Sequence, residues 1–245
     1  MINIVIPMAG RGSRFANAGY TMPKPLIDVK GHYMIEWVVK NLTPNCEHRF
    51  IFLCLQEHII KFNLSERLEK IAPGCVIVPV NQVTEGAACT VLLAEKYINN
   101  DDQLMIANSD QYVDCDINEY IEAQRNEDGL IMTMFAKDDK WSFVAFDENQ
   151  YITMVREKEV ISNEATVGIY NFQHGSDYVK YAYKMIDMDL RVKGEFYVAP
   201  VYNMLIADGK KIVFKNIGSV GNGMYGLGVP EDLNAFLNNP ISDKF

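Results

Sequence analysis

The first half of the chain alternates short apolar runs with segments of helical periodicity. Four apolar runs have the length of buried strands: residues 2–7, 50–55, 76–80 and 104–107. Three further segments carry apolar residues at helical spacing: 34–42, 64–71 and 85–98. Thr84 stands where the third helix would need an N-cap. This order predicts right-handed crossovers and a mainly parallel sheet, which binds ligands at the carboxyl ends of its strands.

The second half follows a different pattern, with strand-like segments joined by short links. Four of them predict an antiparallel extension of the sheet: 130–136, 142–147, 151–156 and 166–172. We then expect helices over about 175–187 and 199–207, a strand at 211–217 and a helix from Pro230. No Pro-, Gly- or Ser-rich linker or internal repeat interrupts the 245 residues. One α/β domain is therefore expected over 1–245, with halves at 1–125 and 126–245.

A glycine-rich loop directly follows the first predicted strand. Gly10 and Gly12 let the backbone turn sharply and bring several N–H groups close to an anion. Arg14 adds a planar fork of donors that can hold two phosphate oxygens at once. Prolines on both sides of Lys24 restrict the backbone there, so its ammonium group projects from a stiff stretch of chain. Two cations and a set of backbone amides are thus expected around one anionic ligand.

Two common nucleotide-binding loops do not match this segment. The dinucleotide fingerprint has a third glycine where Phe15 stands and runs straight into a helix, whereas residues 16–19 lead into a proline-punctuated stretch. A Walker loop ends in Gly-Lys-Ser/Thr, which is absent here. A tight turn with solvated Arg14 and Lys24 is the plainest alternative to a phosphate site.

Residues 9–15, Ala-Gly-Arg-Gly-Ser-Arg-Phe, and 23–26, Pro-Lys-Pro-Leu, resemble the signature of the nucleotidyltransferases that make sugar nucleotides and related activated compounds. The resemblance implies a Rossmann-like, three-layer α/β fold, with the nucleotide bound by the first half and its acceptor by the second. It makes Arg14 and Lys24 catalytic: Arg14 would hold the leaving end of the triphosphate, and Lys24 would neutralise charge at the α-phosphate and acceptor phosphate. The loop residues that would bind the nucleotide are Met8, Ala9, Gly10, Arg11, Gly12 and Ser13.

Asp110 ends the segment Ala-Asn-Ser-Asp that follows the predicted strand at 104–107. A carboxylate at a strand end is well placed to hold Mg²⁺ against phosphates. By resemblance Asp110 is the catalytic metal ligand, and Ser109 contacts the nucleotide. An Asx turn is the plainer interpretation of the same carboxylate. Asp114 and Asp116 form a DxD motif, which keeps glycosyltransferases that use nucleotide sugars as an alternative.

Residues 82–88 resemble the family's base-recognition segment. Gln82 offers a donor and an acceptor to the edge of a base, and Gly86, followed by Ala87, lets the backbone approach the ring. A surface glutamine before a capped helix is the alternative interpretation. The single residue between the two loop glycines is more similar to pyrimidine-using members, which favours CTP.

The acceptor-binding segments are suggested by residues 156–159, Arg-Glu-Lys-Glu, and by Gly168 with the two residues after it. By resemblance, Lys158 would meet the acceptor phosphate as a catalytic residue and Glu157 a polar group of the acceptor. The remaining candidate acceptor contacts are Glu195 and Tyr197. As a charge run alone, 156–159 would be a solvated face.

One departure from the family concerns the metal. Sugar-1-phosphate members carry Trp-x-Asp-x-Gly-Thr-Pro, whose Asp is a second metal ligand, and Gly226 takes its place here. Mg²⁺ can also be held by one carboxylate with phosphates and waters. The short loop, Gly226 and the chain's small size are similar to bacterial capsule cytidylyltransferases that join CMP to L-glutamine phosphate. A sugar-1-phosphate nucleotidyltransferase, a DxD glycosyltransferase and a catalytically silent nucleotide-binding module are the alternatives.

Composition restricts the partners. A net charge of −9 leaves no basic excess to displace counterions from nucleic acid or an anionic membrane. No apolar stretch approaches the ~18 residues of a membrane span, and no signal peptide is visible. The five cysteines form no CxxC pair, and we expect Cys54 and Cys89, which have apolar neighbours, to be core thiols in a reducing cytoplasm. The expected ligands are a nucleoside triphosphate, Mg²⁺ and a phosphorylated small molecule, and a homo-oligomer is left open.

Overall fold

One large sheet forms the centre of the computed structural model, which describes all 245 residues. Its strands are β1 (Ile2–Met8), β4 (His48–Leu55), β5 (Val76–Val80), β6 (Gln103–Ala107), β7 (Gln111–Val113), β8 (Gly129–Phe135), β9 (Ser142–Phe146), β10 (Ile152–Glu157), β11 (Glu164–Phe172), β12 (Ile212–Val220) and β13 (Gly223–Gly226). A separate hairpin pairs β2 (Asp28–Val29) with β3 (His32–Tyr33).

Ten α-helices accompany the sheet: α1 (Ser13–Asn17), α2 (Met34–Leu42), α3 (Gln56–Phe62), α4 (Leu64–Ile71), α5 (Ala87–Leu92), α6 (Glu95–Ile98), α7 (Ile117–Glu122), α8 (Gly175–Asp187), α9 (Val201–Ala207) and α10 (Pro230–Leu237). Two single 3₁₀ turns are η1 (Lys24–Leu26) and η2 (Pro240–Asp243). No helix is long and apolar enough to cross a membrane.

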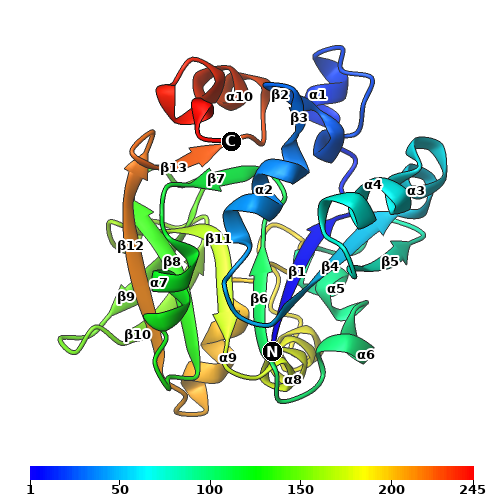
Figure 1. Ribbon diagram of the computed structural model, residues 1–245. Coiled ribbons are helices and arrows are strands. Elements are labelled where there is room, and N and C mark those ends of the chain that lie inside the picture. Colours follow the sequence, from blue (N-terminus) through cyan, green and yellow to red (C-terminus); the bar gives the residue numbers. More distant parts are fainter.

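The sheet has the strand order β5-β4-β1-β6-β11-β8-β12-β13-β7 (Figure 1). The first four strands are parallel, as the alternating pattern predicted. β11 then runs antiparallel to both β6 and β8, and the β9–β10 hairpin pairs with β11 beside the main path. The predicted antiparallel extension is therefore present, although β12 pairs parallel with β8 and β13. The α/β, three-layer fold is confirmed.

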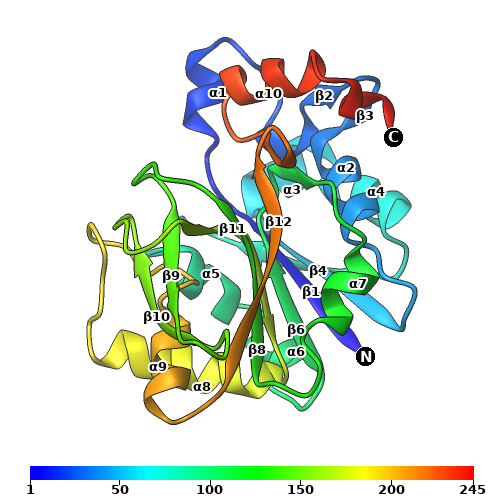
Figure 2. The same ribbon diagram turned by 90° about the vertical axis from the view of Figure 1, so that its left-hand side faces the viewer.

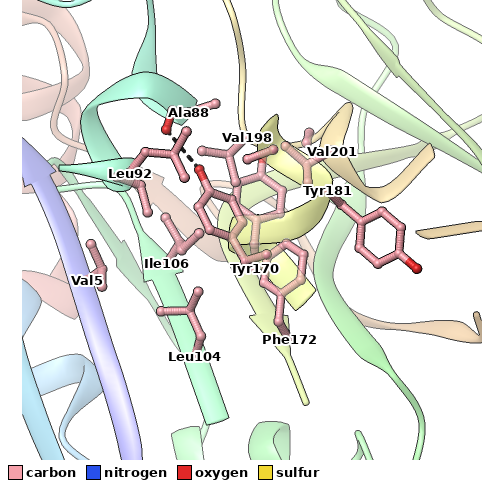
Figure 3. Close-up of a cluster of buried hydrophobic side chains, with 14 of the residues drawn as sticks. Val5, Ala88, Leu92, Leu104, Ile106, Tyr170, Phe172, Tyr181, Val198 and Val201 are labelled. Atoms are coloured by element: carbon pink, nitrogen blue, oxygen red, sulfur yellow. Dashed lines mark hydrogen bonds between the residues drawn. The ribbon is translucent and has the colours of Figure 1, made fainter. Parts of the chain in front are cut away.

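Helices cover both faces of the sheet because its strands are apolar on both sides. On β1, Val5 faces a core formed with α5, α8 and α9, while Ile4 and Ile6 face a second core formed with α2, α4 and α7. Figure 2 shows the two helical layers on either side of the strands. Figure 3 shows part of the first core, including Ala88. The Ala88 carbonyl accepts a hydrogen bond at 3.0 Å from the hydroxyl of Tyr178, which is buried in the same core.

A third, smaller core joins segments from the two ends of the chain beyond the carboxyl ends of the parallel strands. Phe15 of α1, Trp37 of α2 and Phe236 of α10 are all buried in it. The ring centroids of Trp37 and Phe236 lie 5.2 Å apart in an edge-to-face arrangement. This packing holds α1 and α10 above the sheet edge at which ligands bind in folds of this kind.

Several local predictions need correction. The loop after β1 does run into a helix, the short α1, because Gly12 takes a left-handed conformation and begins it. The expected helix over 85–98 is two helices, α5 and α6, separated at Leu93 and Ala94. Its N-cap is Gly86 rather than Thr84, whose hydroxyl donates to the Gly86 carbonyl at 2.9 Å. Besides α1 and the two 3₁₀ turns, six elements were not predicted: β2, β3, α3, β7, α7 and β13.

Candidate active site

The loop between β1 and α1 presents free backbone donors at the carboxyl end of β1. Gly12, with φ of 61°, needs the left-handed region that glycine enters freely. A Cβ at Gly12 would lie 3.2 Å from the Cβ of Lys24, so the loop and η1 are closely packed. The N–H groups from residue 10 to residue 13 donate to no acceptor within the chain. This is the arrangement of amides that suits an anion.

Lys24 and Asp110 meet across this edge of the sheet. The Lys24 Nζ donates to the Asp110 Oδ2 at 2.7 Å, and the two side chains are 24% and 23% exposed. η1 positions the lysine, because Pro23 precedes the turn and Pro25 lies within it. Asp110 follows β6, as predicted. Two residues 86 positions apart thus form one partly desolvated ion pair.

A cleft of about 580 Å³ contains this pair's carboxylate. Exposed Arg14 lines it from α1, and Lys158 lines it from the end of β10. One cavity is therefore lined by three of the four predicted catalytic residues, Arg14, Asp110 and Lys158. The fourth, Lys24, donates a hydrogen bond to Asp110.

A second cavity, of about 320 Å³, adjoins the cleft, because Asn108, Lys140, Trp141 and Lys158 line both. Three predicted acceptor contacts line it: Glu157, Gly168 and Tyr197. Gly168 has φ of 84°, and a Cβ there would lie 2.0 Å from the Asn108 Nδ2. Most of the remaining wall is apolar or aromatic, including Trp141 and Tyr170. We call this cavity the second-half pocket.

Glu157 is the carboxylate of the second-half pocket. Ser142 donates a hydrogen bond to its Oε2, and burial raises the pKa of Glu157 above its ordinary value. Lys158, beside it, has φ of 56°, and its Nζ donates to the Tyr197 hydroxyl while lying 4.4 Å from that ring's centroid. The hydrogen bond to Tyr197 raises the pKa of Lys158. The pocket therefore holds a cation at its junction with the cleft and a carboxylate with unused acceptor capacity.

A third cavity, of about 280 Å³, adjoins the second-half pocket, because Pro7 and Ala87 line both. Ala9, Gly10, Gly86 and Ala87 line it, as expected of nucleotide contacts. Glu195 also lines this cavity, although it was predicted on the acceptor side. The second-half pocket thus shares lining residues with both other cavities, and we call the three together the groove.

The remaining predicted nucleotide contacts do not line the groove. Met8 and Ser109 are buried, and Met8 belongs to the second core. The others are Arg11, Gly12, Ser13 and Gln82. Gly86 also has a purely structural reason to be glycine, since a Cβ would lie 2.3 Å from the Phe196 carbonyl oxygen.

The DxD motif takes up other interactions. Asp114 pairs with Lys244 at 2.8 Å, and Asp116 accepts from the Asn118 N–H as the N-cap of α7. Neither residue lines the groove. The motif therefore has a structural explanation.

Sequence reasoning missed several groove residues. Asn108 was passed over within its own motif, and Lys140 and Trp141 lie in a link between predicted strands. Asp232 lines the cleft from the first turn of α10, whose start at Pro230 was predicted. Only its position two residues after that proline could have indicated it.

Known proteins match this chain in sequence and in structure. The profile of a family described as nucleotidyl transferase matches residues 4–210. The bifunctional protein GlmU of Methanococcus maripaludis (strain C5) is 22% identical over 179 residues, which cover 71% of this chain and 40% of that protein. The chain thus matches well under half the length of this relative.

Two solved structures share the fold over nearly the whole chain. A nucleoside-diphosphate-sugar pyrophosphorylase from Vibrio cholerae RC9 has a TM-score of 0.82 and 25% identity, covering 96% of this chain and 99% of that one. The inositol-1-phosphate CTP transferase from T. maritima has a TM-score of 0.75 and 15% identity, covering 98% and 93%. Because the family profile matches residues 4–210, the chain belongs to the nucleotidyl transferase family.

Proposed function

We propose that the protein transfers CMP from CTP to a phosphorylated small molecule and releases pyrophosphate. The observation that carries the proposal is the Lys24–Asp110 ion pair, whose carboxylate shares a cleft with Arg14 and Lys158, together with the free backbone amides of the glycine-rich loop. This arrangement gives a triphosphate donors along its length and gives a second phosphate a separate cation. We further propose that residues 1–125 bind the nucleotide and 126–245 the acceptor, within one domain.

The reaction needs no protein nucleophile. An acceptor phosphate oxygen attacks the α-phosphorus, a new P–O bond forms, and the bond to the β-phosphate oxygen breaks as pyrophosphate leaves. Arg14 and the loop amides hold the leaving end, while Lys24 neutralises charge near the α-phosphate and Lys158 near the acceptor. Positioning and charge neutralisation are the contributions that such a transfer asks of a protein.

Magnesium fits the donor set of the cleft. Asp110 offers a carboxylate, and Gly228 leaves the space beside it open, since a Cβ there would lie 2.6 Å from the Asp110 Oδ2. Gln111, 4% exposed, also lines the cleft, and its unpartnered Nε2 is a hydrogen-bond donor that suits a phosphate oxygen accompanying the cation rather than the cation itself. When bound, Mg²⁺ would neutralise phosphate charge and orient the triphosphate. Asp110 would hold it.

The second-half pocket guides the choice of acceptor. Its aromatic and apolar walls suit a hydrocarbon body, and the Glu157 carboxylate suits a hydrogen-bond donor such as an amide or ammonium group. L-Glutamine phosphate, of the kind used in bacterial capsule synthesis, has these features and is the proposed acceptor. A sugar-1-phosphate is the second candidate, supported by the pyrophosphorylase likeness at 25% identity. CTP is supported by the short loop and by the fold shared with a CTP transferase.

The test is a matrix of pyrophosphate-release assays. Each of CTP, UTP, dTTP, GTP and ATP is combined with Mg²⁺ and with L-glutamine phosphate, phosphocholine or a sugar-1-phosphate, and products are identified by mass spectrometry. We expect CTP with L-glutamine phosphate to release one pyrophosphate per nucleotidyl product. Release only with a sugar-1-phosphate would move the assignment to the second candidate. No release from any pair would contradict nucleotidyl transfer by this chain.

A further inference from the structure

Besides Asp110, two carboxylates line the cleft, Asp139 and Asp232, and the reaction described above leaves both without a task; Asp232 is the one that lies beside Gly226. Asp232 lies in the first turn of α10 and lines the cleft together with Asp110. It is exposed and takes part in no ion pair within the chain, whereas Asp110 is bonded to Lys24. Glu231, its neighbour in the same turn, does not line the cleft.

We propose that Asp232 and Asp110 together hold the divalent cation, with Asp232 supplying the carboxylate that Gly226 lacks. The proposal rests on the proposed function, because the cation is the one that accompanies the nucleotide. Mg²⁺ is commonly bound through one or two carboxylates plus substrate phosphates, so a pair of this kind completes an ordinary site.

The position of the Asp232 carboxylate supports this assignment. A Cβ built on Gly226 would lie 3.1 Å from the Asp232 Oδ2 and 3.6 Å from its Cβ. The Asp232 side chain therefore occupies the space into which a side chain at position 226 would extend. An aspartate at 226 and the aspartate at 232 are alternative ways to place one carboxylate at this point of the cleft.

The segment from Gly226 to Gly228 connects the two carboxylates. The Leu227 N–H donates to the Asp110 carbonyl at 2.8 Å, which fixes the segment against the end of β6. Gly226 lies against Asp232, and a Cβ on Gly228 would crowd the Asp110 Oδ2 at 2.6 Å. Both carboxylates thus border the same short segment, and its two glycines leave the space beside them free of side chains.

A purely structural role for Asp232 has to be separated from cation binding. A carboxylate in the first turn of a helix also stabilises the positive end of the helix dipole. Glu231→Ala removes such a charge from the same turn without touching the cleft and is the matched control. Gly226→Asp combined with Asp232→Ala returns a carboxylate to the cleft from the other residue. Gly226 does not have a positive φ, so its backbone accepts a side chain.

The experiment measures Mn²⁺ binding, without turnover, by electron paramagnetic resonance. Mn²⁺ is titrated into each variant with a non-hydrolysable α,β-methylene analogue of CTP, and the analogues of UTP, dTTP and GTP are run in parallel. We expect Asp232→Ala to weaken Mn²⁺ binding about tenfold or more, the scale for losing a metal-site group. Glu231→Ala should match the wild type, and the double variant should recover most of the lost affinity. Circular dichroism confirms that each variant is folded.

Each other outcome has a defined meaning. Wild-type Mn²⁺ affinity in Asp232→Ala would overturn the assignment while leaving the proposed nucleotidyl transfer intact. Weakened binding that the double variant fails to recover would also overturn it, because the loss would then be structural. If the wild type retains no Mn²⁺ with any analogue, the proposed function itself fails, and this inference fails with it.

Discussion

Lys24 is the cation of the proposed site that is already paired with a carboxylate of the cleft. Its ammonium is partly desolvated and held 2.7 Å from Asp110, so little reorganisation is needed before it meets a phosphate. Lys24→Ala should lower kcat by about 10² or more, the scale for losing a preorganised charge contact. Steady-state pyrophosphate release measures this.

Lys30→Ala is the control for that substitution, because Lys30 pairs with Asp243 outside the groove. Its kcat should stay near that of the wild type. Turnover of Lys24→Ala within a factor of a few of the wild type would remove Lys24 from the catalytic set.

Glu157 gives the second-half pocket a pH dependence. Burial raises its pKa above the ordinary 4.5, so its protonated form is favoured more in the folded than in the unfolded chain. The protonated Glu157 side chain therefore contributes to the free energy of unfolding. This contribution is fully present below the pKa of Glu157 in the unfolded chain and is lost as pH rises through its pKa in the folded protein. Glu157→Gln keeps an acceptor for Ser142 without this titration. Its free energy of unfolding, relative to wild type, should therefore be higher at pH 7 than at about pH 4.

Urea unfolding of the two proteins between about pH 4 and pH 8 measures the difference. A gap that stays constant across this range would show that Glu157 titrates normally. Ser162→Ala is a suitable control, since Ser162 donates to the Val144 carbonyl and has no carboxylate partner.

Some of the candidate site residues could be predicted from local motifs, and others could not. The loop, Lys24 and Asp110 were identified because their motifs are local and carry charge. Glu195, predicted as an acceptor contact, lines the cavity of the loop glycines, because backbone hydrogen bonds from Phe196 to Glu85 and from Ala88 to Phe196 bring this stretch beside residue 86. Asp232 was missed because it is suggested as a site residue only by its closeness to Gly226 in the folded chain, and no spacing pattern in the sequence reveals this closeness.

At the scale of elements, the junction between α5 and the segment before α9 holds one wall of the groove. Gly86 has φ of 140°, and the Ala88 N–H donates to the Phe196 carbonyl at 3.0 Å. Gly86→Ala would place a Cβ 2.3 Å from that carbonyl oxygen, in a backbone region that other residues rarely adopt. We expect it to cost about 1–3 kcal/mol of stability, measured by urea unfolding.

Gly10→Ala is the comparison for Gly86→Ala. A Cβ at position 10 would have no other atom within 4 Å, and Gly10 does not have a positive φ. The free energy of unfolding of Gly10→Ala should therefore differ little from that of the wild type. Equal stability losses in the two variants would show that the close approach at Gly86 does not matter.

Element boundaries show where local patterns fail. Most strands and α2, α4, α8 and α10 follow from apolar periodicity, because each buries one clear face. α3 has no buried residue, so it lacked the apolar stripe that would have predicted it. The expected helix over 85–98 is broken at Leu93 and Ala94, and β13 is only four residues long, held by its neighbours β12 and β7. Such elements depend on partners distant in the sequence.

At the scale of the whole molecule, the two tryptophans report on the two halves separately. Trp37 is buried in the third core, and Trp141 lines the groove. Because one sheet crosses both halves, we expect both to unfold in a single cooperative transition. The Trp37→Phe and Trp141→Phe variants should each give a fluorescence transition that coincides with far-ultraviolet circular dichroism. Separate midpoints within one variant would indicate two independent folding units.

The pairing of β11 with β6 has a consequence for how the protein folds while it is being synthesised. Tyr170 and Phe172 pair with Ile106 and Leu104, so the sheet of the first half is closed along that side only by chain made later. A fragment that stops after residue 125 would leave β6 as a bare edge, which is prone to self-association. During synthesis the glycine-rich loop is therefore made well before residues 193–232, which supply part of the cleft lining, so the cleft can form only after those residues have followed.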